Sequence, residues 1–321
     1  MGHVLALCGG VGGAKLAFGL TRILAPSDLT IAVNVGDDFE HLGLCISPDI
    51  DTVVYTLADL SDRQRGWGLA GETWQFMETL RRLGGEGWFQ LGDRDLAMHV
   101  ERTRRLRAGE TLSTVTRALS ARLGVDHPIV PVSNDPVRTM LDCETGCLTF
   151  QEYFVREKCE PAVARIDYQG ANRARLAPDV AAALARADLS AIVICTSNPY
   201  LSIAPMLAIP ALHDGLAARR VPSVAVSPLV GGRAIKGPTT KLMRELGVSP
   251  TNATIAEYYA GLIDGLLIDT TDEADLTSLA AGGLSCGATR TVMENDEHRV
   301  ALANDTLALA RKIAAARAAA A

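Results

Sequence analysis

Short apolar runs recur along this chain and alternate with segments whose apolar residues have helical spacing. The runs are rich in β-branched residues and occupy residues 4–7, 29–34, 129–132, 191–195, 221–226 and 266–269. Strands buried on both faces appear as continuous apolar runs, and their alternation with helices indicates right-handed crossovers in a mostly parallel sheet. The pattern therefore predicts an α/β protein with a Rossmann-like three-layer fold, in which helices cover both faces of the sheet.

One stretch interrupts this alternation. Between about residues 51 and 123 the strand pattern nearly vanishes, and helical spacing predicts helices over residues 52–60, 72–83, 94–106 and 112–123. We interpret residues 51–123 as a helical insertion packed on the sheet, and residues 1–50 and 124–321 as the Rossmann-like nucleotide-binding core. Elsewhere, residues 147–150 predict half of a hairpin, and the alanine-rich end from residue 300 predicts a terminal helix.

A glycine segment follows the first apolar run and precedes a helical pattern over residues 16–24. It reads Cys8-Gly9-Gly10-Val11-Gly12-Gly13-Ala14-Lys15. Glycine allows a positive φ and close approach of the backbone, while the N–H groups and positive end of the following helix attract an anion. We therefore predict a phosphate or nucleotide site, and the alternative is a tight turn without a ligand. The segment matches neither a dinucleotide fingerprint, because Lys15 replaces its last glycine, nor a P-loop.

Four carboxylates follow the second predicted strand: Asp37, Asp38, Asp49 and Asp51. The topology directs their loops toward the glycine segment, where a cation would relieve the mutual repulsion of the carboxylates. Oxygen ligands beside a phosphate suit Mg²⁺, which typically takes one or two carboxylates. We predict that Asp37 and Asp51 are catalytic residues and metal ligands. Alternatively, Asp37 binds a ribose hydroxyl as in dehydrogenases, or Asp49 and Asp51 cap the helix that begins near Thr52.

Polar loops also follow the third, fourth and fifth apolar runs. Ligands of open sheets bind beyond the carboxyl ends of the strands, so these loops are candidate binding segments. The candidate substrate-binding residues in them are Asp135, Arg138, Ser197, Asn198, Ser227 and Gly231. Lys236, a few residues further on, is an additional candidate phosphate contact.

The predicted insertion contains residues that suit either packing or binding. Asp93 and Arg94 precede a predicted helix, so an aspartate there can cap the helix and Arg94 can bind a phosphate or carboxylate through two hydrogen bonds. Four aromatic residues can wall a flat ring or pack in a core: Trp67, Trp74, Trp88 and Phe89.

Composition narrows the class of protein. A chain with 48% hydrophobic and 21% charged residues is typical of a soluble globular protein, and no apolar run reaches the 18 residues of a membrane span. We therefore expect a cytoplasmic protein with no membrane partner. The formal charge of −6 argues against nucleic acid as a partner. One local basic run is interpreted as the solvated face of a helix, namely Arg102, Arg104, Arg105 and Arg107.

No motif for a covalent nucleophile is present. None of the six histidines lies in a motif, and neither a G-x-S-x-G elbow nor a Cys-His signature occurs. We therefore predict direct transfer between bound substrates instead of covalent catalysis.

Taken in order, these motifs resemble those of one family, the CofD family of 2-phospho-L-lactate transferases. The resemblance runs from residue 3 to about residue 260. It rests on Gly9-Gly10-Val11-Gly12-Gly13, Asn34-Val35-Gly36-Asp37-Asp38, Ser47-Pro48-Asp49-Ile50-Asp51-Thr52, Leu91-Gly92-Asp93-Arg94-Asp95, Ser197-Asn198-Pro199 with Ser202-Ile203, and Ser227-Pro228 with Gly231-Gly232.

The resemblance implies an activity. Such enzymes transfer a phospholactyl, phosphoenolpyruvyl or phosphoglyceryl group from a guanosine diphosphate adduct to the ribityl hydroxyl of 7,8-didemethyl-8-hydroxy-5-deazariboflavin. GMP leaves, Mg²⁺ is required, and the product is a precursor of coenzyme F-420. The glycine segment and Lys15 would then hold the diphosphate, and the insertion would cover the deazaflavin, the acceptor.

The resemblance also implies roles for particular residues. Asp51 would lie near both the metal and the deazaflavin, and it is a candidate acceptor for the proton of the attacking hydroxyl. Asp38, Asp93 and Arg94 would bind substrate with the glycine segment. Gln90 occupies a position where some family members carry a basic residue that contacts the deazaflavin, so this contact differs here.

Two other functions are alternatives to the transferase, a regulator and a dehydrogenase. The same superfamily resembles regulators that bind a nucleotide sugar without turning it over. A regulator has little use for the two aspartate motifs, Gly36-Asp37-Asp38 and Pro48-Asp49-Ile50-Asp51, together with Gly92-Asp93-Arg94-Asp95. A nicotinamide dehydrogenase is disfavoured by the broken fingerprint. The three-carbon acid of the donor is not distinguished. A homodimer is expected, since an exposed sheet edge or helix face favours self-association.

Overall fold

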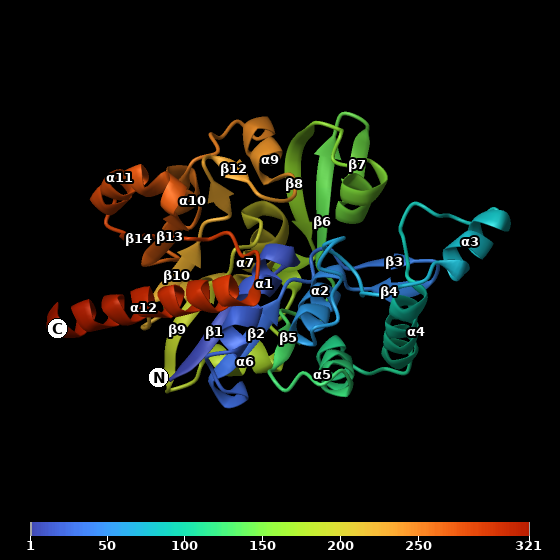
Figure 1. Ribbon diagram of the computed structural model, residues 1–321, viewed down its shortest axis with the longest axis horizontal. Helices are drawn as coiled ribbons and strands as arrows, with labels where there is room; N and C mark the ends of the chain where they lie inside the picture. Colours follow the sequence, from blue (N-terminus) through green and yellow to red (C-terminus); the bar gives the residue numbers. More distant parts are fainter. Residues whose placement is uncertain (1, 321) are drawn as a thin grey trace.

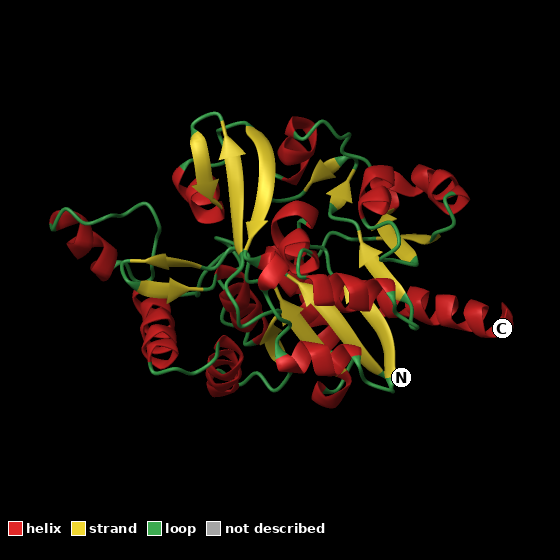
Figure 2. Ribbon diagram, turned by 180° about the vertical axis from the view of Figure 1, so that it is seen from behind, coloured by secondary structure: helices red, strands yellow, loops and turns green. Residues whose placement is uncertain are grey.

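A seven-stranded parallel sheet forms the centre of the protein, in the strand order β14-β13-β10-β9-β1-β2-β5 (Figures 1 and 2). The computed structural model describes residues 2–320. The sheet consists of β1 (His3–Cys8), β2 (Leu29–Val33), β5 (Ile129–Pro131), β9 (Leu189–Ile194), β10 (Ser223–Val226), β13 (Gly265–Asp269) and β14 (Ser285–Thr289). All neighbouring strands pair in parallel, which confirms the predicted fold class.

The predicted apolar runs form strands that are covered on both faces of the sheet. The residues of β1, β2, β10 and β13 are all buried. All six predicted strands are present, while β14 was missed. Its sequence, Ser-Cys-Gly-Ala-Thr, has few bulky branched residues, and it is a half-buried edge strand with a weak apolar pattern.

Helices lie on both sides of this sheet and beside it. They are α1 (Gly10–Thr21), α2 (Pro48–Leu57), α3 (Gln75–Arg82), α4 (Asp93–Arg107), α5 (Leu112–Arg122), α6 (Pro178–Leu184), α7 (Ala204–Leu207), α8 (Pro210–Ala217), α9 (Thr239–Glu245), α10 (Asn252–Tyr258), α11 (Leu276–Ala281) and α12 (Asp296–Ala320). Short 3-10 or π turns are η1 (Pro26–Asp28), η2 (Glu152–Arg156), η3 (Ala171–Arg173), η4 (Pro199–Ile203) and η5 (Thr270–Asp275). Helix α1 packs against both α2 and α12, and α12 crosses the sheet (Figure 1). The predicted terminal helix is confirmed.

The region 51–123 is largely helical, as predicted. Helix α2 packs against α1, whereas α3 and α4 project to one side together with the hairpin of β3 (Phe39–His41) and β4 (Leu44–Ile46) (Figure 1). A second small core of Ile46, Met77 and Leu91 joins the hairpin to this projecting part. The division into a core and an insertion stays a prediction.

Two further small sheets flank the carboxyl edge of the main sheet. One is antiparallel, with β6 (Arg138–Cys143) between β7 (Gly146–Thr149) and β8 (Val163–Gln169), so the predicted half-hairpin at residues 147–150 is confirmed. The other pairs β11 (Leu229–Val230) with β12 (Arg233–Ala234).

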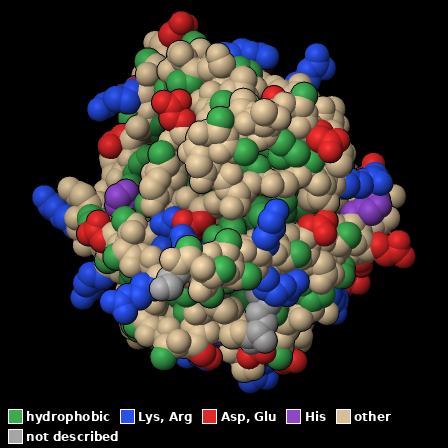
Figure 3. Space-filling model, turned by 90° about the vertical axis from the view of Figure 1, so that its left-hand side faces the viewer, with side chains coloured by type: hydrophobic (Ala, Val, Ile, Leu, Met, Phe, Trp, Pro, Cys, Tyr) green, Lys and Arg blue, Asp and Glu red, His purple; other side chains and the backbone are tan. Residues whose placement is uncertain are grey.

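The surface of the protein mixes both signs of charge. On the face shown in Figure 3, basic and acidic side chains are interspersed and no large area of one sign is visible. Within residues 2–320, no helix is both long enough and apolar enough to cross a membrane.

Candidate active site

The two central strands β1 and β9 feed connections that run in opposite directions along the sheet. From β1 the chain proceeds to β2, and from β9 it proceeds to β10 on the other side. Such a topological switch point leaves a crevice at the carboxyl ends of the strands, where ligands of open α/β sheets bind. The loops after the two strands meet there, because Ser197 Oγ donates to Gly9 O at 2.7 Å and accepts from Gly9 N–H at 3.1 Å.

The glycine segment forms the first turn of α1 itself, which corrects the expectation of a glycine turn ahead of a helix at residue 16. Gly9 is the extended N-cap residue, and the helix begins at Gly10 with a φ of +64°. A Cβ at Gly12 would lie 2.3 Å from Thr196 O, and one at Gly13 would lie 2.3 Å from Ser197 Oγ. The glycines therefore let the positive end of α1 pack directly on the β9 loop, where it faces the crevice.

A buried carboxylate, Asp49, already occupies part of this helix end. Its Oδ1 accepts from Gly10 N–H at 2.7 Å, and its Oδ2 accepts from Asn34 Nδ2 at 3.0 Å. Burial raises the pKa of Asp49 to about 6, although the hydrogen bonds from Asn34 and Gly10 oppose the rise. Helix α2 begins at Pro48, so Asp49 does not take the N-cap position that the sequence allowed.

Asp37 and Asp38 lie beside Asp49 in the same buried cluster. Burial raises the pKa of Asp37 well above its usual range, and the neighbouring charges of Asp49 and Asp38 raise it further. Burial also raises the pKa of Asp38 to about 7, although Arg138 opposes this rise. Ser47 Oγ donates to Asp38 Oδ2 at 3.0 Å, while Asp38 Oδ1 is buried without a hydrogen-bond partner.

This cluster offers carboxylate oxygens, which are ligands of the kind that Mg²⁺ takes. Among the described residues, no group of three or more His, Cys, Asp or Glu side chains is arranged to hold a metal ion alone. Mg²⁺, however, is usually held by one or two carboxylates and completes its shell with water and phosphate oxygens. The raised pKa of Asp37 and the unpartnered oxygen of Asp38 fit such an ion, because a cation would stabilise both carboxylates.

Asp51 has a different environment from the other three aspartates. Its carboxylate is bound at two points by the guanidinium of Arg102, with Nη1 donating to Oδ2 at 3.0 Å, and both side chains are buried. His99 Nδ1 lies 3.7 Å from the same Oδ2. Burial raises the pKa of Asp51, and the positive charge of Arg102 opposes this effect. The roles of Asp37 and Asp51 as metal ligands stay predictions.

The structure corrects the interpretation of Arg102 as a solvated residue. Arg104 and Arg107 are exposed on α4 as expected, but Arg102 has only 2% of its surface exposed. Arg102 lies three positions after the buried His99, on the face of α4 that packs toward β4. The spacing of three residues between His99 and Arg102 could have indicated that both lie on the same face of the helix. The neighbouring arginines instead suggested a solvated basic face.

Asp93, at the start of α4, caps α3, and Glu72, in the loop before α3, caps α4. The carboxylate of Asp93 accepts from the N–H groups of Gln75 and Phe76 at the start of α3. Glu72 in turn accepts from the N–H groups of Arg94 and Asp95 at the start of α4. The predicted capping role of Asp93 therefore exists, but it acts on a neighbouring helix. Arg94 is exposed and donates to Ala70 O at 2.7 Å.

The remaining candidates are distributed around the carboxyl edge. Asn198 accepts from Tyr200 and Leu201 N–H groups and so caps η4. Ser227 Oγ donates to Asn252 Oδ1 at 2.6 Å.

The other three candidates differ in how near they lie to the carboxylates. Gly231 N–H donates to Asp272 at 2.9 Å, and Asp135 is paired at the surface with Arg175. Arg138, at the start of β6, is close enough to lower the pKa values of Asp37 and Asp38, so it belongs to the carboxylate cluster.

The predicted aromatic residues divide into two groups. Trp88 and Phe89 pack edge-to-face against Phe39 and His41 of the β3–β4 hairpin, with ring centroids 4.8–5.7 Å apart in the closest pairs. Trp67 lies against Trp74 with centroids 6.1 Å apart. The first group is a packing cluster, whereas Trp67 is 44% exposed and lines a pocket.

Comparison with known proteins places the chain in a family. The sequence model described as "2-phospho-L-lactate transferase CofD" matches residues 4–306. The chain belongs to the CofD family. A phosphoenolpyruvate transferase from Streptomyces griseus is 39% identical over 319 residues, covering 98% of this chain and 100% of the relative. A 2-phospho-L-lactate transferase from Methanosarcina mazei is 36% identical over 302 residues, covering 94% of this chain and 98% of the relative.

The fold of this CofD family member also has a solved counterpart. A crystal structure of a UPF0052 family protein from Bacillus halodurans superposes with a TM-score of 0.60 at 17% identity. The superposition covers 95% of this chain and 98% of that one, so the similarity extends through the whole architecture.

In this CofD family member, Gln90 is surrounded by its own polar partners. Its Oε1 accepts from Arg81 Nη2 at 2.7 Å, and its Nε2 donates to Gly87 O at 2.7 Å. The guanidinium of Arg81 therefore lies beside Gln90, the position at which some family members carry a basic residue. Arg81 was missed by the sequence analysis, since nine positions separate it from Gln90 on an exposed helix.

Proposed function

We propose that this CofD family member transfers a phosphoenolpyruvyl, phospholactyl or phosphoglyceryl group from a guanosine diphosphate adduct to the ribityl hydroxyl of 7,8-didemethyl-8-hydroxy-5-deazariboflavin. GMP is released, and the product enters the biosynthesis of coenzyme F-420. The observation that carries this proposal is the meeting of the buried carboxylates Asp37, Asp38 and Asp49 with the glycine start of α1 at the switch point. The family and its named relatives favour a transferase over a nucleotide-sugar-binding regulator.

The chain's own groups account for the positioning that such a transfer requires. The start of α1 would hold the diphosphate, with Ser197 fixing the position of the glycine segment. Asp37 would hold Mg²⁺, as predicted, and Asp38 would take the place predicted for Asp51, because Arg102 binds the Asp51 carboxylate at two points. Bound there, the ion would supply charge neutralisation to the diphosphate. Phosphoryl transfer depends mostly on positioning and charge stabilisation, so these groups suffice without a covalent nucleophile.

The reaction itself forms one bond and breaks one. The ribityl oxygen bonds to the phosphorus that carries the three-carbon acid, and the bond from that phosphorus to the oxygen of GMP breaks. The hydroxyl proton needs an acceptor, and we assign it to Asp51. Its carboxylate is held in one orientation by Arg102, on the side of the site that faces α4.

The acid carried by the donor is proposed to be phosphoenolpyruvyl. The Streptomyces relative with that name is 39% identical to this chain, compared with 36% for the Methanosarcina 2-phospho-L-lactate transferase.

We also propose that the protein is a homodimer and is located in the cytoplasm. Sedimentation velocity would test the homodimer.

Mass spectrometry of the reaction tests the function. The protein would be mixed with the deazariboflavin, Mg²⁺ and each of the three guanosine diphosphate adducts, with a chelator as the control. A phosphodiester product that disappears with the chelator is expected, most rapidly from the phosphoenolpyruvyl donor. Absence of product from every donor, with tight binding of a nucleotide sugar, would instead indicate a regulator.

A further inference from the structure

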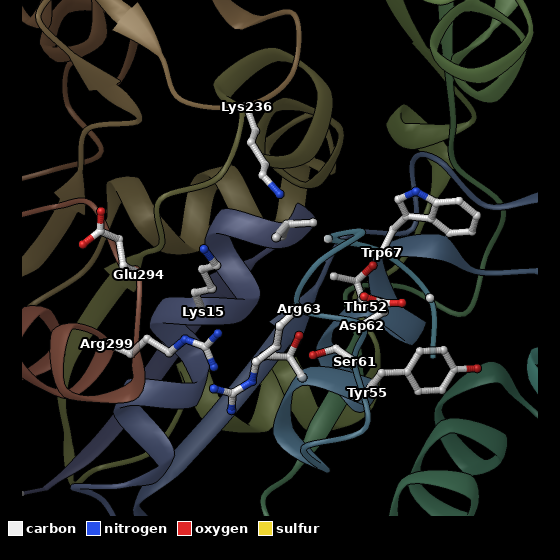
Figure 4. A pocket seen from close by; sticks show the side chains of 14 residues that line it. Lys15, Thr52, Tyr55, Ser61, Asp62, Arg63, Trp67, Lys236, Glu294 and Arg299 are labelled. Carbon is white, nitrogen blue, oxygen red and sulfur yellow. The ribbon is translucent and has the colours of Figure 1, made fainter. Parts of the chain in front are cut away.

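A small pocket with many cationic side chains lies between α1, α2 and the segment 61–68. Its volume is about 80 Å³ (Figure 4). Four basic residues from four separate segments line it: Lys15, Arg63, Lys236 and Arg299. Figure 4 shows Lys15 and Lys236 pointing into the same space from opposite sides, with the guanidinium groups of Arg63 and Arg299 below them. We call this feature the cationic pocket.

Two of these cations have unused hydrogen-bonding capacity. Within residues 2–320, the exposed Lys236 forms no hydrogen bond or ion pair. Arg299 is 4% exposed, and its Nε is buried without a hydrogen-bond partner, although its Nη1 pairs with Asp296 at 3.1 Å. A buried, unpartnered guanidinium N–H is costly unless a ligand satisfies it. Arg299 therefore brings a positive charge to the pocket that its ion pair with Asp296 only partly neutralises.

The acidic residues that line the pocket are engaged with other partners. Asp62 accepts from the N–H groups of Gln64 and Arg65, and Glu294 pairs with Arg290. Arg63 does have acidic partners, Asp59 and Asp296, but neither of them lines the pocket. The positive charge inside the pocket is therefore in excess.

The repulsion among the basic groups acts on the pKa of Lys15. Lys15 Nζ donates to Met293 O at 2.8 Å, and its pKa is lowered by burial and then by the charges of Arg299 and Lys236. An anion placed among these three groups would reverse that effect. The pocket is thus chemically matched to a negatively charged group.

The cationic pocket adjoins the proposed reaction centre. Val11 lines the pocket and directly follows Gly10 at the start of α1, while Thr52 lines it and directly follows Asp51. One buried water needs at least about 10–15 Å³, so 80 Å³ accommodates several non-hydrogen atoms but not a nucleoside. The pocket suits a small anionic group attached to a ligand whose phosphates lie at the helix end.

We propose that the cationic pocket binds the carboxylate of the three-carbon acid on the donor. This inference rests on the proposed function. Outside the diphosphate, the carboxylate is the one anionic group of the donor, and all three candidate acids possess it. Lys236 and Lys15 would bind it from opposite sides, and the guanidinium groups of Arg63 and Arg299 would add positive charge below them. The pocket then explains how the enzyme distinguishes the acid-bearing donor from plain GDP.

The test compares binding of GDP with binding of the phosphoenolpyruvyl adduct of GDP, each by isothermal titration calorimetry in the presence of Mg²⁺. The variant is Lys236→Ala, because this exposed loop residue can be truncated without disturbing the core. The matched control is Arg233→Ala on β12, three positions before Lys236, since Arg233 is exposed and does not line the pocket. Lys236→Arg preserves the charge at the site.

For Lys236→Ala, the Kd of the adduct should rise about 10-fold or more, as expected for the loss of one hydrogen bond to a charged group. The Kd of GDP should change less than about 2-fold, and Arg233→Ala and Lys236→Arg should bind both ligands nearly as the wild type does. Equal adduct affinity in Lys236→Ala and the wild type would overturn the inference. Equal losses for GDP and the adduct would also overturn it, because Lys236 would then bind the diphosphate.

The result that would contradict the proposed function differs from the result that would contradict the carboxylate site. If the wild type binds GDP and the adduct, and Lys236→Ala selectively weakens the adduct, but no transfer to the deazariboflavin occurs, the carboxylate site stands and the proposed activity is wrong. If the wild type binds neither nucleotide, both proposals are wrong.

Discussion

Arg102 of α4 and Asp51 of α2 form a buried two-point ion pair although 51 positions separate them in the chain. The pair ties the projecting helix α4 to the helix that starts beside the glycine segment. It is also the feature that fixes the orientation of the Asp51 carboxylate. Tyr55 and Asp95 extend the network, since Tyr55 Oη donates to Asp95 Oδ1 at 2.5 Å.

Removal of Arg102 should destabilise the protein strongly. Arg102→Met would leave the Asp51 carboxylate buried without its partner, and breaking a buried pair in this way costs about 3–5 kcal/mol of unfolding free energy. Urea unfolding followed by circular dichroism would measure the loss. The control is Arg104→Ala, because Arg104 is exposed on the same helix and its pair with Glu101 is a surface pair. Similar stabilities of the two variants would contradict the assigned role of the buried pair.

Replacement of Asp37 should impair the Mg²⁺-dependent reaction. Asp37→Asn is expected to lower turnover at least about 10- to 100-fold, because even residues that support a metal ligand have effects of this size. The concentration of Mg²⁺ needed for half-maximal turnover should also rise. Asp51→Asn should lower turnover by a similar factor through loss of the proton acceptor. Asp135→Asn, at the surface pair with Arg175, serves as the control. Normal turnover with a normal Mg²⁺ dependence in Asp37→Asn would refute the metal assignment.

In metal-free buffer, Asp38 and Asp49 should each contribute a loss of stability as the pH rises from about 4 to about 7. Burial raises the pKa of Asp38 to about 7 and that of Asp49 to about 6 in the folded protein, above the ordinary value of 3.8. The folded state therefore binds more protons than the unfolded state in this interval, and each group lowers the unfolding free energy by up to about 1.4 kcal/mol per pH unit.

Thermal unfolding in EDTA at several pH values would measure this slope. Asp38→Asn should flatten it, because the neutral amide has no proton to lose. Mg²⁺ should restore stability most strongly near pH 7, where more of the carboxylates can ionise to bind it. A stability that rises over this interval in EDTA, equally in the wild type and Asp38→Asn, would show that the buried aspartates do not govern it.

Enlargement of Gly12 should separate α1 from the β9 loop. A Cβ there would lie 2.3 Å from the backbone oxygen of Thr196, which cannot yield as a flexible side chain does. We expect Gly12→Ala to lose about 1–3 kcal/mol of stability and to weaken GDP binding. Gly215→Ala is the matched helical control, because its Cβ would meet only the flexible end of Leu184 at 3.2 Å. Unchanged GDP affinity and stability in Gly12→Ala would contradict the role of this close approach.

The sequence by itself determined the parallel sheet, the helical character of residues 51–123 and the position of the glycine segment. These features follow from local patterns: apolar runs for buried strands, helical spacing for amphipathic helices and glycines where a backbone is approached closely. The sequence did not predict the strand β14 or the short hairpins of β3–β4 and β11–β12. These strands are too short, or contain too few bulky apolar residues, to give a strand pattern.

Only the tertiary structure decided which polar groups meet. The pairing of Arg102 with Asp51, the contact of Gly13 with Ser197 and the gathering of Lys15, Lys236 and Arg299 around one pocket join residues that lie far apart in the chain. Local spacing assigns a residue to a face of a helix or an end of a strand. The packing of whole elements against one another determines which charged group it faces, and therefore whether that charge is solvated, paired or available to a ligand.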